Sequence, residues 1–478
     1  MQETETVGVG IDFGTSNSVA ALFDGTTLAV VDFGQGRNSI PSATYLNRDY
    51  QALTGQEAID EYIADNIGRR VELAAVKIGE ARTSTGQYDD TGLPQTADSQ
   101  AIYSPAMFDV NLPGRLFYGT KQLLASLEED ALPVFEKYYR LEAIITPILL
   151  RIRQALANEA RCKFTIEMLP VHVEIGRPVN FEFGGDKGNE RAVARLCTAF
   201  GNAGFTDQEM CFEPVAAAMS YLNSEGRREA GTVMTVDFGG GTLDFSILRA
   251  GVQGFSVLGT YGIGLGGNHV DQTLFRALLF PLLGRGSMVR YSTADGPIEK
   301  QFPFENYADF LLNWPVSYTL NQNSYITPIR EIIMAGGKDA VTFQRLLDLI
   351  QFNYSYLIFD YIRRFKECFS TQEQATLDIP ELDITLTLER EEFDRVILDI
   401  VQTFEQAMQQ AVSRTGLREA EIDRVICVGG STQIPAIKAV LQKHFPDRVV
   451  EHDIFTSVAS GLAIQDYHRR LADGNRSR

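Results

Sequence analysis

A strand-like segment that ends in Asp-Phe-Gly occurs twice in the chain, and this repeat constrains the fold more than any other feature. Residues 7–22 read VGVGIDFGTSNSVAAL, and residues 232–248 read TVMTVDFGGGTLDFSIL. In each copy an apolar run is followed by small residues and then by a second apolar run, which is the pattern of a β-hairpin. Because a repeated element indicates a duplicated fold, we expect two related halves.

The rest of the chain alternates between strand and helix patterns. A third strand and glycine turn, VICVGGSTQ at residues 425–433, precedes a helical pattern at residues 434–445. Further strands are predicted at residues 169–175 and 255–259, and further helices at residues 133–161 (interrupted by Pro147), 189–200, 213–223, 339–369 and 390–415. This alternation is typical of α/β proteins.

The length of the chain favours two units. A single hydrophobic core stops growing at roughly 250–300 residues, and this chain has 478. We place the boundary near residues 212–230, so that residues 1–220 form an N-terminal lobe and residues 221–478 a C-terminal lobe. Residues 79–113 and about 284–337 interrupt the alternation and are interpreted as insertions, since long loops are uncommon unless they are functional.

Composition excludes several classes of function. The chain has 62 acidic and 43 basic residues, a formal net charge of −19, so we expect no nucleic-acid partner. The five cysteines form no CxxC pair and indicate free thiols in a reducing compartment. We find no signal peptide and no apolar run long enough to span a bilayer, and therefore expect a cytoplasmic protein without a membrane partner.

The turns of the two hairpins have the composition of phosphate-binding loops. Such loops need converging backbone N–H groups, and only small residues let the chain approach a phosphate closely. The residues with this composition are Gly14, Thr15, Ser16 and Asn17 in the first hairpin and Gly239, Gly240, Gly241 and Thr242 in the second. Asp12 and Asp237 end the preceding strands, where a carboxylate can hold Mg²⁺ through water or orient an attacking water. We expect phosphate, metal and water to meet between the lobes.

Two other nucleotide-binding motifs find little support. A P-loop needs GxxxxGK[ST], but Lys338 is followed by Asp339. Residues 262–267 match GxGxxG, yet a dinucleotide site also needs an acidic residue about 20 positions later, and residues 278–291 contain none.

Five motifs resemble the ATPase domain of the 70-kDa heat-shock chaperones of the DnaK type, especially the short YegD-like members that end after this domain. They are IDFGTSNS at residues 11–18, FEPVAAAMSYL at 212–222, VDFGGGTLDFSIL at 236–248, GLGGNHVD at 264–271 and VGGSTQIP at 428–435. The similarity extends over residues 7–465. It implies an actin-like ATPase fold of two lobes, each with a ribonuclease-H-like core, that close around ATP or ADP with Mg²⁺.

The resemblance also implies roles for single residues. Asp12 and Asp237 match positions in the water shell of Mg²⁺, and Glu213 with Asp237 matches the acidic pair that positions metal and lytic water. Lys121 matches the lysine that reaches the γ-phosphate, with Lys77 as the alternative. The remaining nucleotide contacts implied beyond the two hairpin turns are Gly266, Gly267, Lys366, Gly429, Gly430 and Ser431.

Departures from the family pattern concentrate around the adenine. Arg363 stands in place of a glutamate and Glu367 in place of an arginine, and Gln433 replaces the arginine expected on the adenine ring. Phe455 and Thr456 occupy two acidic places near the C-terminus. We therefore expect weaker adenine binding, unless Arg363 supplies the missing guanidinium.

Two further acidic positions, near the phosphates, are taken by Asn268 and His269. The local charge is thereby reduced, and we interpret His269 as an ordinary loop histidine.

The sequence thus predicts a monomeric, ATP-hydrolysing member of the chaperone family, in which a partner protein, such as a client, co-chaperone or exchange factor, reads the closure of the lobes. Only ADGNRSR follows Leu471, so we expect no peptide-binding module. Two alternatives stay open. One is a sugar-kinase-like phosphotransferase, for which we identify no separate base, and the other is an actin-like scaffold that polymerises.

Overall fold

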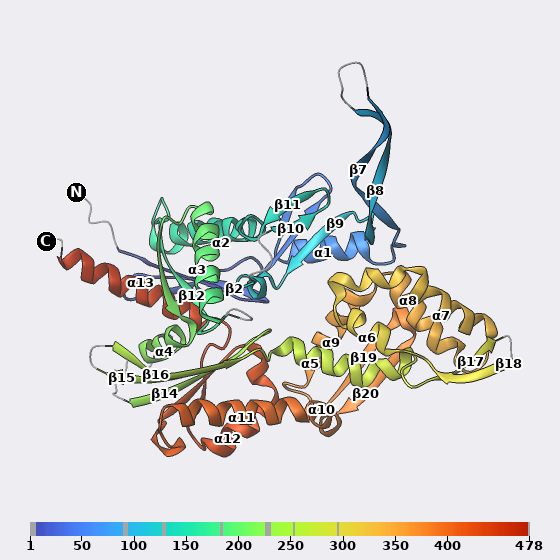
Figure 1. The fold of residues 1–478 in the computed structure, drawn as a ribbon. Coiled ribbons are helices and arrows are strands. Elements are labelled where there is room, and N and C mark those ends of the chain that lie inside the picture. The colour runs from blue at the N-terminus through green and yellow to red at the C-terminus, as the bar shows by residue number, and fades with distance from the viewer. Residues whose placement is uncertain are drawn as a thin grey trace.

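Two mixed β-sheets lie on the left in Figure 1, with helices outside and between them. The computed structural model describes residues 6–88, 94–126, 131–181, 185–224, 231–251, 254–293 and 296–476.

The two sheets have the same topology. The first has the order β13-β12-β1-β2-β3, with β4 beside β2, and the second the order β22-β21-β14-β15-β16. In both, the hairpin is antiparallel and the next two strands run parallel to its first strand. The strands of the first sheet are β1 (Gly8–Phe13), β2 (Asn17–Phe23), β3 (Leu28–Val30), β4 (Ile40–Pro41), β12 (His172–Arg177) and β13 (Asp207–Phe212). Those of the second are β14 (Gly231–Phe238), β15 (Leu243–Gly251), β16 (Gly254–Ile263), β21 (Arg424–Val428) and β22 (Val449–Glu451).

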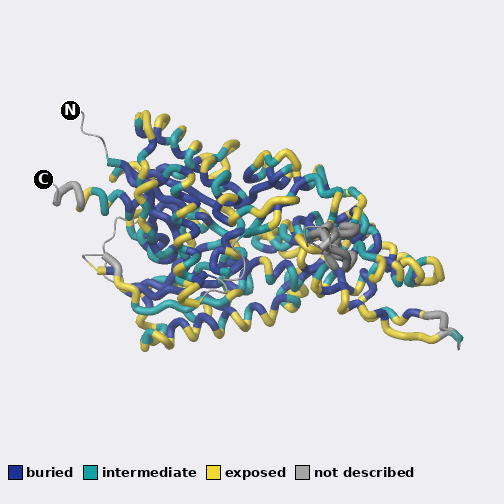
Figure 2. The backbone as a smooth tube through the Cα atoms, turned by 45° about the horizontal axis from the view of Figure 1, so that its top comes forward, coloured by how far each residue is buried: buried dark blue, intermediate teal, exposed yellow. Residues whose placement is uncertain are grey.

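Burial explains why the first hairpin reads as a nearly continuous apolar run. Every residue of β1 and β2 is buried except Asp12 and Asn17, as expected for strands covered on both faces. The buried positions of the molecule concentrate in the sheets and on the helix faces turned toward them (Figure 2). The two exceptions both belong to the predicted site.

Six helices cover the sheets. They are α2 (Leu141–Phe164) and α3 (Gly185–Asn202) on the first sheet, α11 (Leu398–Arg414) and α12 (Pro435–His444) on the second, and α4 (Glu213–Ser224) and α13 (Ser457–Arg476) between the sheets. The last helix thus packs against the first strand, although they are far apart in sequence. The division of the chain at residue 220 stays a prediction.

Glycines allow α13 to approach its neighbours. A Cβ atom on Gly10 of β1 would overlap the backbone of Ala463, and one on Gly461 would overlap the carbonyl oxygen of Ala216 in α4. The two helices and the strand are therefore in backbone contact at these points.

The remaining elements form two outer parts. The part inserted in the N-terminal half contains β5 (Ala43–Asn47), β6 (Ala52–Thr54), α1 (Gln56–Asn66), β7 (Leu73–Tyr88), β8 (Pro94–Asp109), β9 (Gly114–Tyr118), η1 (Thr120–Leu123), β10 (Ala131–Val134) and β11 (Lys137–Arg140). The part in the C-terminal half contains α5 (Gly267–Leu274), η2 (Phe275–Leu279), η3 (Phe280–Leu283), β17 (Met288–Thr293), β18 (Gly296–Gln301), α6 (Glu305–Leu312), η4 (Trp314–Asn321), α7 (Asn323–Ala335), α8 (Ala340–Gln351), α9 (Ser355–Cys368), β19 (Gln374–Ile379), η5 (Pro380–Leu382), β20 (Ile384–Glu389) and α10 (Arg390–Val396). Two short 3₁₀ turns complete the chain: η6 (Glu419–Glu421) and η7 (Gly430–Gln433).

The structure corrects several predicted elements. The helix predicted at residues 133–161 begins only at Leu141, because residues 131–140 form the β10–β11 hairpin, and Pro147 lies inside α2 without ending it. The helix predicted at residues 339–369 is divided by Asn353, whose φ of 57° is left-handed, and the one at residues 390–415 is divided at Ile397.

The two segments interpreted as insertions have regular structure. Residues 79–113 lie mostly in the long antiparallel pair β7–β8, which projects from the rest of the molecule (Figure 1). Residues 284–337 contain a hairpin and three helical segments.

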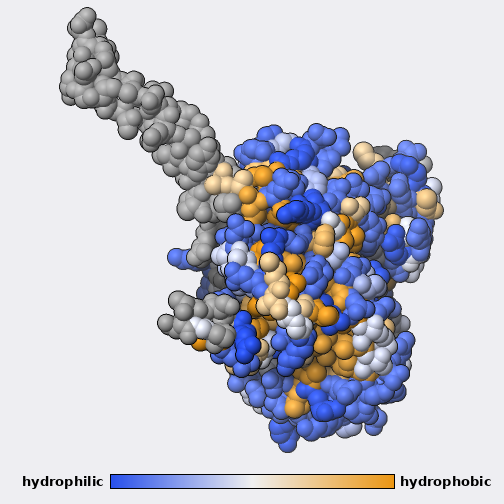
Figure 3. Space-filling model, turned by 90° about the vertical axis from the view of Figure 1, so that its right-hand side faces the viewer, coloured by the Kyte–Doolittle hydropathy of each residue, from blue (hydrophilic) through white to orange (hydrophobic). Residues whose placement is uncertain are grey.

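The outer part of the C-terminal half shows apolar patches on its surface. On this side, hydrophobic residues alternate with hydrophilic ones (Figure 3), and Met334 and Val341 are exposed. Within the described ranges, no helix combines the length and the apolarity needed to cross a bilayer.

We predict that Gly461→Ala destabilises the protein by about 1–3 kcal/mol, because overpacking forces the backbones of α13 and α4 apart. Alanine forms helices better than glycine by about 1 kcal/mol, so any loss measures the contact and not helix propensity. The free energy of unfolding in urea checks this. Gly264→Ala is the control, since a Cβ there meets nothing within 4 Å. Equal stability of the two variants would contradict the close contact.

Candidate functional site

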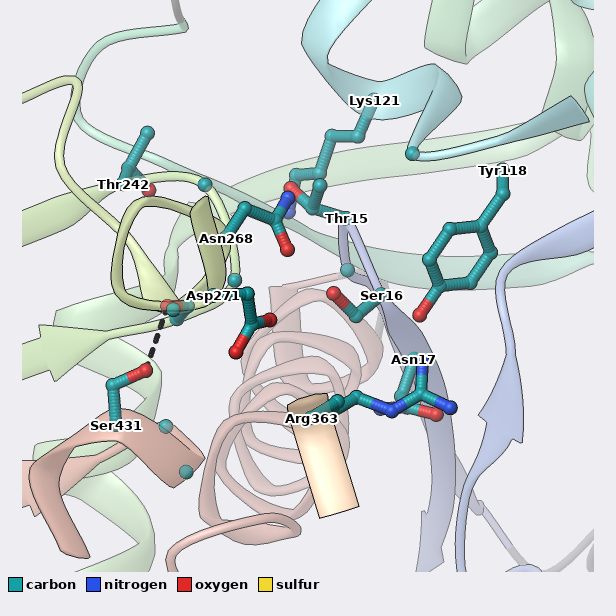
Figure 4. A pocket seen from close by; sticks show the side chains of 18 of the residues that line it. Thr15, Ser16, Asn17, Tyr118, Lys121, Thr242, Asn268, Asp271, Arg363 and Ser431 are labelled. Carbon is teal, nitrogen blue, oxygen red and sulfur yellow. Dashed lines mark hydrogen bonds between the residues drawn. The ribbon is translucent and has the colours of Figure 1, made fainter. Parts of the chain in front are cut away.

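A cavity of about 770 Å³ lies where the turns of the two hairpins meet (Figure 4). Its lining includes every residue predicted to hold nucleotide or metal except Gly266. A Cβ atom on Gly266 would overlap the backbone of Gly240, so Gly266 supports the second turn from behind.

The two glycine turns approach each other across the cavity. A Cβ atom on Gly240 would overlap the Oγ of Ser16. The N–H of Gly267 donates to Gly239 O (2.9 Å) and that of Asn268 to Gly240 O (2.9 Å), which fixes the second turn against α5. No described residue accepts a hydrogen bond from the N–H of Gly240, Gly241 or Thr242. Such a group of free donors is what an anion needs.

One buried lysine lies among three acidic residues at the bottom of the cavity. Lys121 Nζ is 2.7 Å from Glu213 Oε1, and both side chains are about nine-tenths buried. Lys121 is placed by the short helix η1 after β9, and Glu213 is the first residue of α4 after β13. Asp12 and Asp237 are the last residues but one of β1 and β14 and face the same group.

The carboxylates of this cluster repel one another. Burial, and then the charge of Glu213, raise the pKa of Asp12 to about 7. Burial, with repulsion from Glu213 and Asp244, raises the pKa of Asp237 to about 8, and Lys121 offsets only part of this. Burial alone would lower the pKa of Lys121, but Glu213 and Asp12 hold it above its usual value.

These residues fit a hydrated divalent cation. Three carboxylates against one ammonium leave excess negative charge in a buried place. The described part of the chain contains no cluster of three or more His, Cys, Asp or Glu that could hold a metal directly. Mg²⁺ keeps several of its waters in such sites, so the arrangement suits contacts of Asp12 and Asp237 through water.

The third glycine turn closes another side of the cavity. Ser431 Oγ donates to Gly239 O at 3.2 Å (Figure 4), and Gly429, with a φ of 80°, lies against the backbone of Phe238. Lys366 Nζ pairs with Asp271 Oδ1 at 2.7 Å and donates to Gly267 O at 3.2 Å. Lys366 is thus neutralised by a buried carboxylate of α5 that sequence reasoning missed.

The residues that depart from the family pattern lie on two different walls. Arg363 pairs with Asp360, and its guanidinium points toward Asn17, near Tyr118 (Figure 4). Gln433 accepts a hydrogen bond from Lys438 Nζ at 2.8 Å through its Oε1. Phe455 lies beside Gly430 and is 64% exposed.

His269 corrects one interpretation. It lies in the first turn of α5 and not in a loop, and its Nδ1 accepts the N–H of Gly266 at 3.1 Å. Burial lowers its pKa, which favours the neutral ring that can accept this bond. His269 lies three residues after Gly266, the spacing at which a side chain can cap the first turn of a helix.

The alternative lysine belongs to the projecting strand pair. Lys77 is in β7, and its side chain falls outside the described residues. Lys121, in contrast, is one of the residues that line the cavity.

Aromatic rings connect the two outer parts beside the cavity. Tyr62 of α1 lies 5.6 Å from Trp314 and 5.3 Å from Tyr356, measured between ring centroids, and Trp314 and Tyr356 are 4.9 Å apart. The N–H of Gly68 also donates to Phe352 O at 2.9 Å. We call Tyr62, Trp314 and Tyr356 the aromatic latch.

Comparison with known proteins relates the chain to one family. The profile described as "Hsp70 protein" matches residues 194–281 and 362–467. A chaperone protein dnaK of Cyanidioschyzon merolae is 24% identical over 463 residues, which are 96% of this chain and 61% of that protein. Both comparisons therefore relate the chain to Hsp70 proteins, the family that the five motifs resemble and that has the actin-like ATPase fold. The chain spans 61% of the length of the dnaK relative.

We predict that Asp237→Asn stabilises the protein without nucleotide and Mg²⁺, and more so as the pH rises. The folded state keeps the proton of Asp237 up to a pKa of about 8, whereas the unfolded state loses it near pH 3.8, so this residue lowers stability progressively between these values. The advantage of the variant in free energy of unfolding should grow by about 1–3 kcal/mol between about pH 5 and about pH 8.

Asp24→Asn serves as the control with opposite sign. Slight burial opposes the shift, but hydrogen bonds from Thr27 and Thr26 lower the pKa of Asp24. Its carboxylate therefore adds stability above its unfolded pKa, and the variant should be less stable at about pH 8 than the parent. If the difference in free energy of unfolding between Asp237→Asn and the parent did not change with pH, the repulsion between the buried carboxylates would be refuted.

Proposed function

We propose that the chain is a Mg²⁺-dependent ATP hydrolase of the Hsp70 type, which binds ATP or ADP in the 770 Å³ cavity. The observation that carries this proposal is the convergence of both glycine turns on the buried group of Asp12, Lys121, Glu213 and Asp237. Free N–H groups for phosphates and excess negative charge for a cation lie side by side there. ATP supplies the phosphates for the N–H groups, and Mg²⁺ supplies the cation for the carboxylates.

Each group has a defined task in this proposal. The N–H groups of the turns bind the phosphate oxygens, and Lys121, oriented by Glu213, reaches the γ-phosphate. Bound Mg²⁺ neutralises phosphate charge and favours the ionised form of Asp12 and Asp237. Asp237 then accepts a hydrogen bond from the attacking water and orients it.

We further propose two lobes, residues 1–220 and 221–478, each with a ribonuclease-H-like core and the second with an insertion at about residues 284–337. The shared topology of the two sheets supports this division. The lobes would close on nucleotide, and a partner protein would read the closed state. A monomer in the cytoplasm, acting with a client, co-chaperone or exchange factor, completes the proposal.

We predict that Asp237→Asn lowers the rate of ATP hydrolysis by roughly 10²- to 10⁴-fold while ATP still binds, because the residue positions water and not the nucleotide. Single-turnover hydrolysis and calorimetric binding separate the two effects. Lys121→Ala should also slow hydrolysis, and Lys77→Ala is its comparison. If Lys77→Ala abolished turnover while Lys121→Ala left it normal, the assigned lysine would be wrong. Unchanged turnover in Asp237→Asn would refute its role.

We predict that Tyr62→Leu speeds nucleotide release about 5- to 150-fold. It removes two ring contacts of the aromatic latch, each worth about 0.5–1.5 kcal/mol. Release of a fluorescent ATP analogue, measured by stopped flow, checks this. Tyr139→Leu is the control, because its stacking on Tyr50 (6.0 Å) stays within one outer part. Identical release from both variants would mean that the latch does not oppose opening.

One observation favours the phosphotransferase alternative. A second cavity of about 800 Å³ adjoins the first, shares Thr242 and Asn268 with it, and is lined by the carboxylates Asp244 and Asp309. Either carboxylate could act as a base toward a hydroxyl acceptor. Transfer of labelled γ-phosphate from ATP to sugars, lost in Asp309→Asn, would support this alternative, and release of phosphate to water alone would exclude it. The alternative of a polymerising scaffold predicts that the protein sediments in the presence of ATP, and a protein that stays in the supernatant would exclude it.

A further inference from the structure

We propose that Phe455 is the platform on which the base of the bound nucleotide stacks. This inference rests on the proposed function, since it assumes a nucleotide in the 770 Å³ cavity. It assigns stacking of the base to the apolar face of the Phe455 ring. In the family pattern this task belongs to the arginine that Gln433 replaces.

The fold holds Phe455 at the wall of the cavity. The residue lies in the loop between β22 and α13, and Ile454 O accepts the N–H of Gly429 at 3.1 Å. Asp453 O accepts the N–H groups of Thr456 and Ser457, both at 2.8 Å. The loop is thereby fastened to the third glycine turn. A Cβ atom on Gly430 would lie 3.2 Å from the ring, so the ring packs on bare backbone.

Phe455 is the aromatic lining residue with a free face. It is 64% exposed, and no ring contact joins it to another described aromatic residue. The other aromatic residues that line the cavity are Tyr118, Phe181, Trp314, Tyr356 and Phe359. Phe181 and Tyr356 are 4% exposed, Trp314 belongs to the aromatic latch, and Phe359 packs edge-on against Phe275 at 5.2 Å. Tyr118 faces Ser16 (Figure 4), beside the first glycine turn.

The neighbours of Phe455 suit a flat, apolar group. Ile434, Ile454 and Val458 line the same wall of the cavity, and Ile434 and Val458 are almost fully buried. The phosphates would lie at the glycine turns and carboxylates, so this wall remains for the base. Nucleobases are planar and bind such surfaces by stacking.

No guanidinium competes for this position among the described lining residues. Arg363 is paired with Asp360, which also holds Arg364 at 2.7 Å, and it points toward Asn17. Gln433 carries no charge, and its amide oxygen is fixed by Lys438. Stacking therefore falls to the phenyl ring.

Loss of the Phe455 ring should weaken the binding of every nucleotide and leave the contacts to the phosphates intact. A base stacked on an aromatic side chain is worth about 1–3 kcal/mol, or about 5- to 150-fold in affinity. All bases have an aromatic face, so the effect should be similar for ATP and GTP. Tripolyphosphate has no base and should bind equally well to parent and variant.

Calorimetry with Phe455→Ala, Phe455→Tyr and the control Tyr138→Ala tests this inference. Tyr138 is 77% exposed on β11 and lies outside the cavity. We expect Phe455→Ala to bind ATP and GTP about 5- to 150-fold more weakly, with Phe455→Tyr and Tyr138→Ala near the parent. Unchanged ATP affinity in Phe455→Ala would overturn the inference, as would an equal loss for tripolyphosphate. A parent that binds tripolyphosphate but no nucleotide would overturn it too, and a parent that binds neither would overturn the proposed function itself.

A fluorescence readout tests stacking directly. Trp314 is the single tryptophan of the chain, so a Phe455→Trp, Trp314→Phe double variant carries one reporter at the proposed platform. ATP should quench its fluorescence by ring contact, whereas tripolyphosphate should not. If ATP binds to this variant with parental affinity but leaves the emission unchanged, the base lies elsewhere.

Discussion

The arrangement of the site depends on one buried imbalance of charge. Asp12, Glu213 and Asp237 lie around Lys121, and one ammonium cannot neutralise three carboxylates. This repulsion raises the pKa of Asp12 and Asp237, and a bound cation would offset the same repulsion. The stability that this repulsion costs is thus available as affinity for a cation with its phosphates. The strand ends that create the imbalance are fixed by two sheets, so it cannot relax by local movement.

Close backbone contacts explain why these strand ends stay in place. Gly10 and Gly461 let α13 touch both β1 and α4, and α4 begins with Glu213. The helix that ends the described chain therefore joins the first hairpin to the acidic residue that orients Lys121. Changes in how α13 packs would reach the site through α4.

The sequence predicted the elements whose signals are local. Asp-Phe-Gly followed by small residues identified both hairpins, and the shared sheet topology followed from the repeat. The helix expected at residues 133–161 was wrong at its start, because Pro133 and the aromatic residues near it form a hairpin that tertiary contacts select. Asp271 was missed as a partner of Lys366, since the two lie 95 residues apart and only folding brings them to 2.7 Å. The aromatic latch, which joins α1 to η4 and α9, escaped for the same reason.

The positively charged side chains that line the cavity also indicate where its affinity for a nucleotide comes from. Lys121, Lys366 and Arg363 are each already paired with a carboxylate. Little free positive charge is therefore left to attract a triphosphate, and the formal net charge of the chain is −19. Apart from the contact proposed for Lys121, phosphate binding must come from backbone N–H groups and a divalent cation, so it should weaken when the cation is removed. An apolar platform at Phe455 adds affinity without adding charge. Binding at this wall should depend little on ionic strength, in contrast to a guanidinium, whose contact with a polyphosphate ligand is weakened by salt.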